Sequence, residues 1–131
     1  IIRGLHFQFP PNSETKIIWA ARGEIFVVFV DLRKKSQSFG QWISTIISEN
    51  NKKMLYIERG FASGMCTLTD NCAMLYKMDN YYTPENQGVI RWNDPVIGIK
   101  WPIDNPILSG RDSKAQSFKD FVEKYGGLEV Q

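Results

Sequence analysis

Short apolar runs rich in β-branched and aromatic residues alternate with polar breaks along most of the chain. Such runs predict strands, and the Gly, Asn, Asp and Pro residues between them predict turns. The segment before residue 9 also has a strand-like pattern, so the chain begins within a strand. The other predicted extended segments are residues 16–21, 24–33, 41–47, 54–57, 65–68, 73–78, 89–92 and 97–102.

Two details of this pattern predict how the strands are arranged. Residues 27–30 contain no polar residue, which indicates a strand covered on both faces, inside a sandwich or at a subunit interface. Residues 65–68 and 73–78 are separated by the turn signal Thr69-Asp70-Asn71, which predicts that they form a pair.

A helical pattern occurs only near the end of the sequence. Phe118, Phe121 and Val122 recur at spacings of three and four within residues 113–125, and Gly126 follows as a stop signal. Many short strands and one late helix predict an all-β sandwich or barrel of jelly-roll type, and the 131 residues fit a single domain, residues 1–131.

Composition narrows the function. The formal net charge is only +2 and the basic residues are dispersed, so a nucleic-acid partner is not expected. No apolar run is long enough to cross a membrane and no secretory signal opens the chain, so we expect a cytoplasmic protein. Cys66 and Cys72 are the only cysteines, and we expect both to be buried free thiols.

His6 is the only histidine, and it is the first candidate for proton chemistry near neutral pH. One histidine cannot supply a His-rich metal centre, so no metal is expected. Serine-nucleophile elbows and glycine-rich phosphate loops are missing from the sequence. The remaining chemistry is acid/base catalysis by His6, a tyrosine, and a lysine or arginine that holds an anion.

A series of short motifs then follows in order along the chain. They are residues 3–8 (RGLHFQ), 23–26 (GEIF), 30–33 (VDLR), 38–40 (SFG), 60–62 (GFA), 75–77 (LYK), 81–82 (YY), 92–94 (WND), 99–102 (IKWP) and 108–112 (LSGRD). With these motifs the sequence resembles the dTDP-4-dehydrorhamnose 3,5-epimerases, which are cofactor-free enzymes of deoxysugar biosynthesis. The resemblance implies a cupin-type jelly-roll β-sandwich with a short C-terminal helix, a homodimer, and a nucleotide-diphosphate-linked 4-keto sugar as substrate.

The resemblance also implies a catalytic set. His6 matches the base, Asp112 the carboxylate that orients it, Tyr76 the acid on the opposite face of the sugar, and Lys16 the cation beside its carbonyl. The chemistry requires such groups: a C4 ketone acidifies the hydrogens at C3 and C5, the enolate oxygen needs a positive charge, and inversion needs a proton from the other face.

The expected substrate-binding residues come from the same resemblance. Arg3 and Arg111 match contacts to the nucleotide diphosphate, and Tyr82 matches an aromatic near the base. Gln8, Ser63 and Gln87 complete this set. Taken singly, several residues also have a structural explanation: Tyr76 as core, Lys16 and Arg111 as surface charges, and Asp112 as the cap of the terminal helix.

The geometry of the first strand poses a difficulty. In a regular strand Arg3 and His6 would point to opposite faces, because side chains alternate with a period of two. We expect Gly4 to allow a bulge or twist that brings both to one side.

The sequence departs from the family pattern at three positions. Ser63 stands where the family has a second histidine, Val27 where it has an aspartate, and Gln87 where it tends to have a glutamate. We therefore expect an epimerase with altered substrate or regiochemistry, acting at C3, C5 or both. A 3,4-ketoisomerase or a non-catalytic sugar-nucleotide-binding protein are the alternatives. We also expect that the family's N-terminal arm is missing from residues 1–131.

Overall fold

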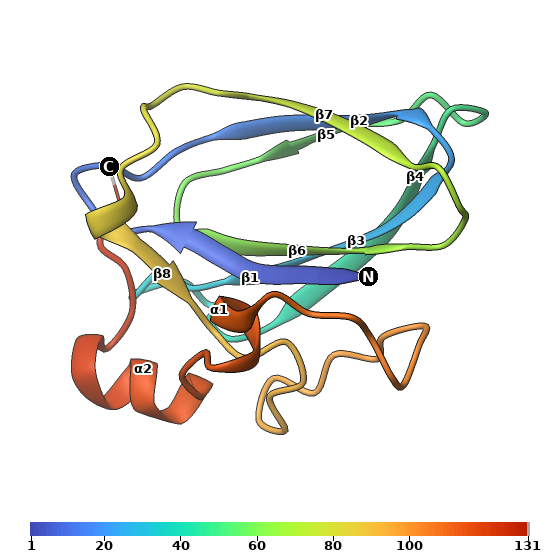
Figure 1. Cartoon of the computed structure of the whole chain (residues 1–131). Coiled ribbons are helices and arrows are strands. Elements are labelled where there is room, and N and C mark those ends of the chain that lie inside the picture. The colour runs from blue at the N-terminus through green and yellow to red at the C-terminus, as the bar shows by residue number, and fades with distance from the viewer. Residues whose placement is uncertain (131) are drawn as a thin grey trace.

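The computed structural model describes residues 1–130 as two facing β-sheets with short helices on one side (Figure 1). One sheet has the strand order β4-β3-β6-β1-β8 and the other β5-β2-β7. The strands are β1 (Ile2–Gln8), β2 (Lys16–Arg22), β3 (Glu24–Asp31), β4 (Trp42–Ser48), β5 (Met54–Ile57), β6 (Phe61–Thr67), β7 (Ala73–Met78) and β8 (Gln87–Val89). The helices are η1 (Pro84–Asn86), α1 (Gly110–Ser113) and α2 (Phe118–Tyr125). The predicted all-β architecture is confirmed.

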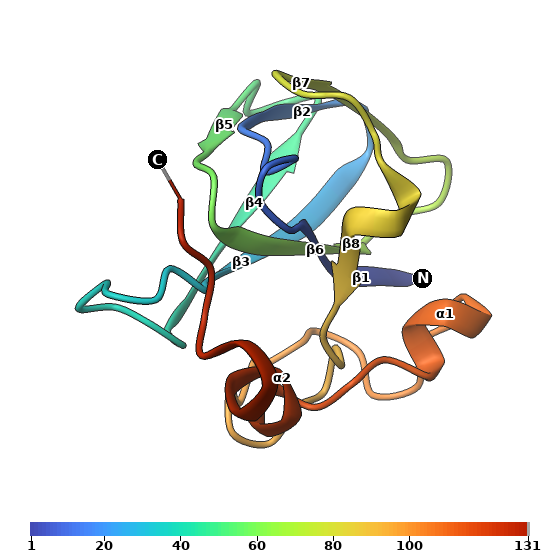
Figure 2. The ribbon, with the colours of Figure 1, turned by 90° about the vertical axis from the view of Figure 1, so that its left-hand side faces the viewer.

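Two hydrophobic clusters hold the layers together. The first lies between the sheets and includes Ile18 of β2, Val27 of β3 and Ile57 of β5. The second joins the other face of the five-stranded sheet to α2, through residues such as Val28 and Phe121. Figure 2 shows the resulting order of layers, with α2 on the side of the five-stranded sheet away from β2, β5 and β7.

Strand β3 belongs to both clusters. Val27 and Val28 are adjacent, point to opposite faces and are both buried. The prediction from residues 27–30 is therefore confirmed: this part of β3 is covered on both faces, by the second sheet on one side and by the cluster around α2 on the other.

The predicted pairing of residues 65–68 with 73–78 is wrong. Strand β6 belongs to the five-stranded sheet and β7 to the three-stranded sheet. The connection is held at the start of β3, because Leu68 N donates to Glu24 O at 2.9 Å and Glu24 N donates to Thr69 Oγ1 at 3.0 Å. The turn therefore carries the chain across the sandwich instead of folding it back as a hairpin.

Two predictions in the second half of the chain need correction. Residues 97–102 form a turn and irregular chain, not an extended strand, because Asp94 Oδ1 accepts hydrogen bonds from the backbone of Val96 and Ile97. The strand predicted at residues 89–92 is β8, which covers Gln87–Val89. Ile90 then exchanges two backbone hydrogen bonds with Leu5 and forms an isolated bridge with Gln116.

The C-terminal helix is shorter than predicted. A single turn, α1, is capped by Ser109, and α2 begins only after Ser117, whose hydroxyl accepts from Asp120 N at 3.0 Å. The backbone between them pairs with Arg91 instead, since Arg91 N donates to Gln116 O at 2.8 Å. The predicted stop is confirmed, because Gly126 adopts a left-handed conformation at the end of α2.

The two cysteines differ. Cys66 is fully buried, as predicted, and its burial raises the pKa of the thiol. Cys72 is only partly buried, so that part of the prediction is wrong; its Sγ lies beside Thr69 Oγ1.

Within residues 1–130, every helix is too short or too polar to cross a membrane.

Candidate active site

A cavity of about 460 Å³ lies between the two sheets. Residues of β1, β2, β3, β6 and β7 line it, together with residues of β8, of α1 and of the loops before β2 and β8. The predicted site residues that line this cavity are Arg3, His6, Lys16, Ser63, Tyr76, Tyr82, Gln87 and Arg111. The structure therefore brings together side chains that are up to 108 residues apart in the sequence.

Gly4 explains how β1 presents both Arg3 and His6 to this cavity. The pairing of β1 with β6 shifts register between these two residues, and Gly4 has a φ of +121°. A Cβ at Gly4 would lie 2.7 Å from both Gly64 Cα and Ser63 O. The expected irregularity at Gly4 is confirmed, and only glycine fits there.

Asp112 is hydrogen-bonded to His6 but does not itself line the cavity. Its Oδ1 lies 2.6 Å from His6 Nε2, and its Oδ2 accepts a hydrogen bond from Gly4 N at 3.3 Å. The Asp112 side chain is almost completely buried. Ser109 caps α1 and Ser117 caps α2, so the alternative explanation of Asp112 as the cap of the terminal helix is wrong.

The surroundings of His6 favour its neutral form. Burial lowers the pKa of His6 below its ordinary value and outweighs the hydrogen bond and charge of Asp112, which raise it. The positive charges of Arg111 and Lys16 lower the pKa further. A neutral imidazole with one nitrogen held by a carboxylate has the other available to accept a proton.

Tyr76 lies on the sheet opposite His6. It belongs to β7, whereas His6 belongs to β1, so the two side chains line opposite walls of one cavity. Tyr76 is 56% exposed, which argues against a role in the hydrophobic core. Within the cavity, the structure thus places an imidazole and a phenol on facing walls.

Lys16 lies on the three-stranded sheet beside Ser63. Its Nζ lies 3.4 Å from Ser63 Oγ and 3.2 Å from Glu14 Oε1. Ser63 of β6 is paired with His6 of β1. Its side chain therefore lies next to the strand that carries the imidazole. Lys16 is therefore an internal, paired side chain and not a freely solvated surface charge.

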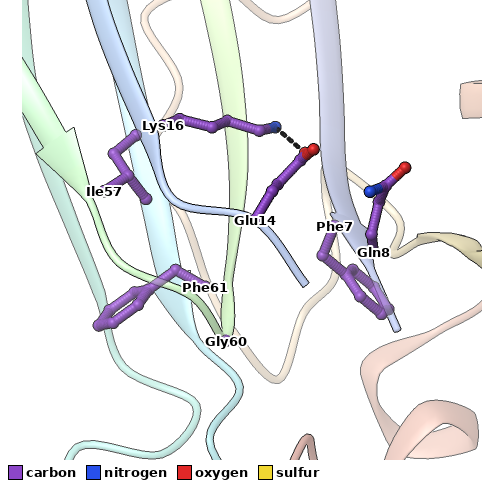
Figure 3. A pocket seen from close by; sticks show the side chains of 7 residues that line it. All are labelled: Phe7, Gln8, Glu14, Lys16, Ile57, Gly60 and Phe61. Atoms are coloured by element: carbon purple, nitrogen blue, oxygen red, sulfur yellow. Dashed lines mark ion pairs between the residues drawn. The ribbon is translucent and has the colours of Figure 1, made fainter. Parts of the chain in front are cut away.

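Glu14 was missed by the sequence reasoning. Figure 3 shows its carboxylate meeting the Lys16 ammonium, with Phe7 and Phe61 nearby. A signal was available, because residues two apart in an extended segment point to the same side. An acidic residue at that spacing before an expected catalytic lysine predicts an ion pair.

Arg111, Gln87 and Tyr82 form a hydrogen-bonded group at the exposed edge of the cavity. Gln87 Oε1 accepts from the Arg111 guanidinium and, at 3.2 Å, from the Tyr82 hydroxyl. Arg111 Nη2 also lies 3.4 Å from His6 Nε2. An exposed guanidinium next to an aromatic ring can hold a phosphate beside a flat base.

Gln8 is not brought to the cavity with the other predicted residues. Its buried amide donates to Asn12 O and Tyr81 O and accepts from Thr83 N, at 2.7, 3.1 and 2.8 Å. Gln8 thereby holds the loop that carries Tyr82. Gln8 and His6 share a face of β1, since residues 6–8 pair with β8 in regular register, but Gln8 lies further along the strand, where the loop takes up its side chain.

The apolar part of the cavity surface includes Val27, one of the three positions at which the sequence departs from the family pattern. Val27 is buried there beside Ile18, Met65 and Met74. Within residues 1–130, no group of three or more His, Cys, Asp or Glu side chains is arranged to hold a metal ion. The cavity therefore offers proton donors and acceptors, cations and an apolar wall.

Comparisons with known proteins agree on one family. Residues 1–120 match the family model of dTDP-4-dehydrorhamnose 3,5-epimerase. The sequence is 47% identical over 116 residues to the dTDP-4-dehydrorhamnose 3,5-epimerase of Salmonella typhimurium, which covers 88% of this chain and 63% of that relative.

Solved structures resemble the fold closely. The rmlC epimerase of Mycobacterium tuberculosis superimposes with a TM-score of 0.95 at 32% identity, covering 98% of this chain and 66% of that one. ChmJ, a 3'-monoepimerase from Streptomyces bikiniensis solved with dTDP-quinovose, gives 0.89 at 30% identity, covering 98% and 65%. The predicted cupin-type sandwich is confirmed. The chain spans just under two thirds of the length of these relatives.

Proposed function

The chain belongs to the dTDP-4-dehydrorhamnose 3,5-epimerase family, and from that premise we propose that it is a cofactor-independent epimerase of a nucleotide-linked 4-keto sugar. The observation that carries this proposal is the His6–Asp112 pair, 2.6 Å apart, on the wall facing Tyr76. The reaction inverts C3, C5 or both without a metal or organic cofactor.

The proposed mechanism uses one group from each wall. Neutral His6 removes the proton next to the sugar carbonyl, and Asp112 stabilises the imidazolium that forms. The electrons move onto the carbonyl oxygen as an enolate, which the Lys16 ammonium stabilises. Tyr76 then donates a proton to the same carbon from the opposite face, which inverts it.

The proposed binding of the nucleotide uses the exposed edge of the cavity. Arg3 and Arg111 hold the diphosphate, and Tyr82 stacks near the base. Gln87 keeps Arg111 and Tyr82 together through its side-chain oxygen. Gln8 contributes indirectly by holding the loop that carries Tyr82.

We propose a narrower regiochemistry than double inversion. Ser63 and Val27 place a hydroxyl and an isopropyl group in the cavity, so His6 is its only imidazole. A single base removes a proton only from a carbon within its reach, and only from the face of the sugar ring that it approaches. ChmJ, a 3'-monoepimerase of similar fold, shows that this fold accommodates a reaction limited to one carbon.

The remaining expectations are part of the same proposal. Residues 1–131 act as a single catalytic domain in a cytoplasmic homodimer. The relatives solved with nucleotide-linked ligands support the substrate class, since their names specify dTDP sugars. Size-exclusion chromatography with light scattering measures the oligomeric state directly.

The test is incubation of the protein in deuterated water with dTDP-4-keto-6-deoxyglucose and with nucleotide-linked 4-keto heptoses, followed by NMR. Deuterium at C3 or C5, with the ketone still at C4, supports the epimerase. A ketone that moves to C3 identifies a ketoisomerase instead. Binding without any exchange, for every sugar, contradicts catalysis and identifies a binding protein.

A further inference from the structure

Glu14 is the most unusual polar side chain at the cavity. Its side chain is only 8% exposed, and Oε2 is buried without a hydrogen-bond partner among the described residues 1–130. Oε1 meets a single partner, the Lys16 ammonium, at 3.2 Å. Figure 3 shows this pair among apolar neighbours, including Phe7, Ile57 and Phe61.

Stability does not account for this arrangement. A buried carboxylate loses its hydration, and one ion pair rarely compensates for that loss. Glu14 lines the main cavity and also a smaller one of about 10 Å³, which has room for about one water molecule. A neutral or apolar side chain of the same volume would suit this position better if only folding mattered.

The geometry of Lys16 suggests what the carboxylate does. An ammonium group has three donors: one meets Glu14, one meets Ser63 Oγ at 3.4 Å, and the third is left for the cavity. Lysine is a flexible side chain with several rotatable bonds. Two fixed partners on the protein side therefore leave the remaining donor pointing in one direction.

We propose that Glu14 is a positioning residue: it anchors the Lys16 ammonium so that its free donor faces the developing enolate oxygen of the substrate. This inference rests on the proposed function for the role of Lys16, but the anchoring itself is a property of the protein without substrate. Glu14 contributes no proton to the reaction, and Ser63 is the second anchor of the same ammonium.

The variant Glu14→Gln tests this role because it keeps the shape of the side chain and removes its charge. We expect kcat for deuterium exchange to fall about 10- to 100-fold, because a displaced Lys16 stabilises the enolate poorly. KM should stay within about twofold, since the groups proposed to bind the nucleotide are untouched. The matched control is Glu58→Gln, which removes a glutamate from a 3.6 Å ion pair with Arg33 at a 60% exposed position; its kcat and KM should not change.

A second measurement needs no substrate. In ¹⁵N-lysine-labelled protein, the Lys16 ammonium should give an observable, slowly exchanging NMR signal, assigned by its loss in Lys16→Met. We expect Glu14→Gln to abolish this signal and Glu58→Gln to keep it. If Glu14→Gln does not fold, Glu14→Asp replaces it, because shortening the side chain by one methylene also releases the ammonium.

The outcomes separate the two proposals. An unchanged kcat in folded Glu14→Gln, or a Lys16 signal that persists in it, overturns the positioning role. A fall in kcat accompanied by an equal loss of nucleotide binding also overturns it, because that pattern indicates general damage to the site. If the wild-type protein exchanges no proton, the proposed function fails, and the Lys16 signal alone decides the role of Glu14.

Discussion

Two aspartates, Asp31 and Asp112, are equally buried, each 1% exposed, yet their surroundings differ sharply. Asp31 is saturated by Arg33 and by the hydroxyls of Ser36 and Ser38, with contacts of 2.5 to 3.0 Å. Asp112 instead binds one titratable ring and one backbone N–H, and that ring lines the cavity.

The difference separates a structural carboxylate from a functional one. Although burial alone would raise the pKa of Asp31, hydrogen bonds from Arg33, Ser36 and Ser38 lower it well below its usual range. Every partner of Asp31 is a permanent donor at the end of β3. In the proposed mechanism the partner of Asp112, His6, gains and loses a proton, so the charge of Asp112 matters during the reaction cycle.

The largest effect is expected from Asp112→Asn. An amide holds the His6 ring in a different tautomer and cannot stabilise the imidazolium, so kcat/KM should fall by about 10³-fold, or about 4 kcal/mol. Steady-state kinetics with the best sugar substrate measures the loss. A variant that remains folded and retains more than a tenth of wild-type activity contradicts the pairing of Asp112 with His6 as part of the mechanism.

Asp31→Asn should damage stability and spare catalysis. Loss of the buried carboxylate leaves Arg33 and two hydroxyls poorly paired, which we expect to cost about 2–3 kcal/mol in the free energy of unfolding. Because the folded-state pKa of Asp31 lies below its unfolded value, its contribution is present above that unfolded value and is lost as the pH falls below it.

Urea unfolding at pH 7 and at pH 3 checks this prediction. The difference in stability between wild type and Asp31→Asn should be larger at pH 7 than at pH 3, while kcat of the folded variant stays within about twofold of wild type. A large loss of kcat with unchanged stability would reverse the roles assigned to the two aspartates.

The smallest effect is expected in the pH profile. Only neutral His6 accepts a proton, and burial, Arg111 and Lys16 lower its pKa below the ordinary 6.5. The acid limb of kcat/KM should therefore lie below pH 6.5, with activity falling about tenfold per pH unit beneath it. A limb above pH 6.5 would show that Asp112 outweighs burial. Asp31→Asn should leave the limb in place.

Much of this arrangement could be predicted from the sequence. The strand pattern predicts the sandwich, and Gly4 predicts the irregularity that turns both Arg3 and His6 toward one cavity. The motif at residues 108–112 also predicts that a carboxylate distant in sequence meets His6, as it does at 2.6 Å. Local residue preferences predict the first two of these features, and the family pattern predicts the third.

Other features depend on contacts that local patterns do not encode. Strands β6 and β7 follow each other like a hairpin, but backbone bonds to Glu24 at the start of β3 send them to different sheets. Gln8 belongs to a motif with His6, yet it holds the loop that carries Tyr82 and does not itself line the cavity. The spacing of Glu14 and Lys16 could have predicted their ion pair, but the burial of Glu14 depends on side chains distant in the sequence, such as Phe61.

The most direct test compares wild type with His6→Asn for exchange of the C3 and C5 hydrogens of a nucleotide-linked 4-keto-6-deoxy sugar in deuterated water. Asparagine keeps a polar group beside Asp112 and removes the base. The account predicts deuterium incorporation by wild type and at least a 10³-fold slower rate in the folded variant. Undiminished exchange in His6→Asn would contradict the assignment of His6 as the base.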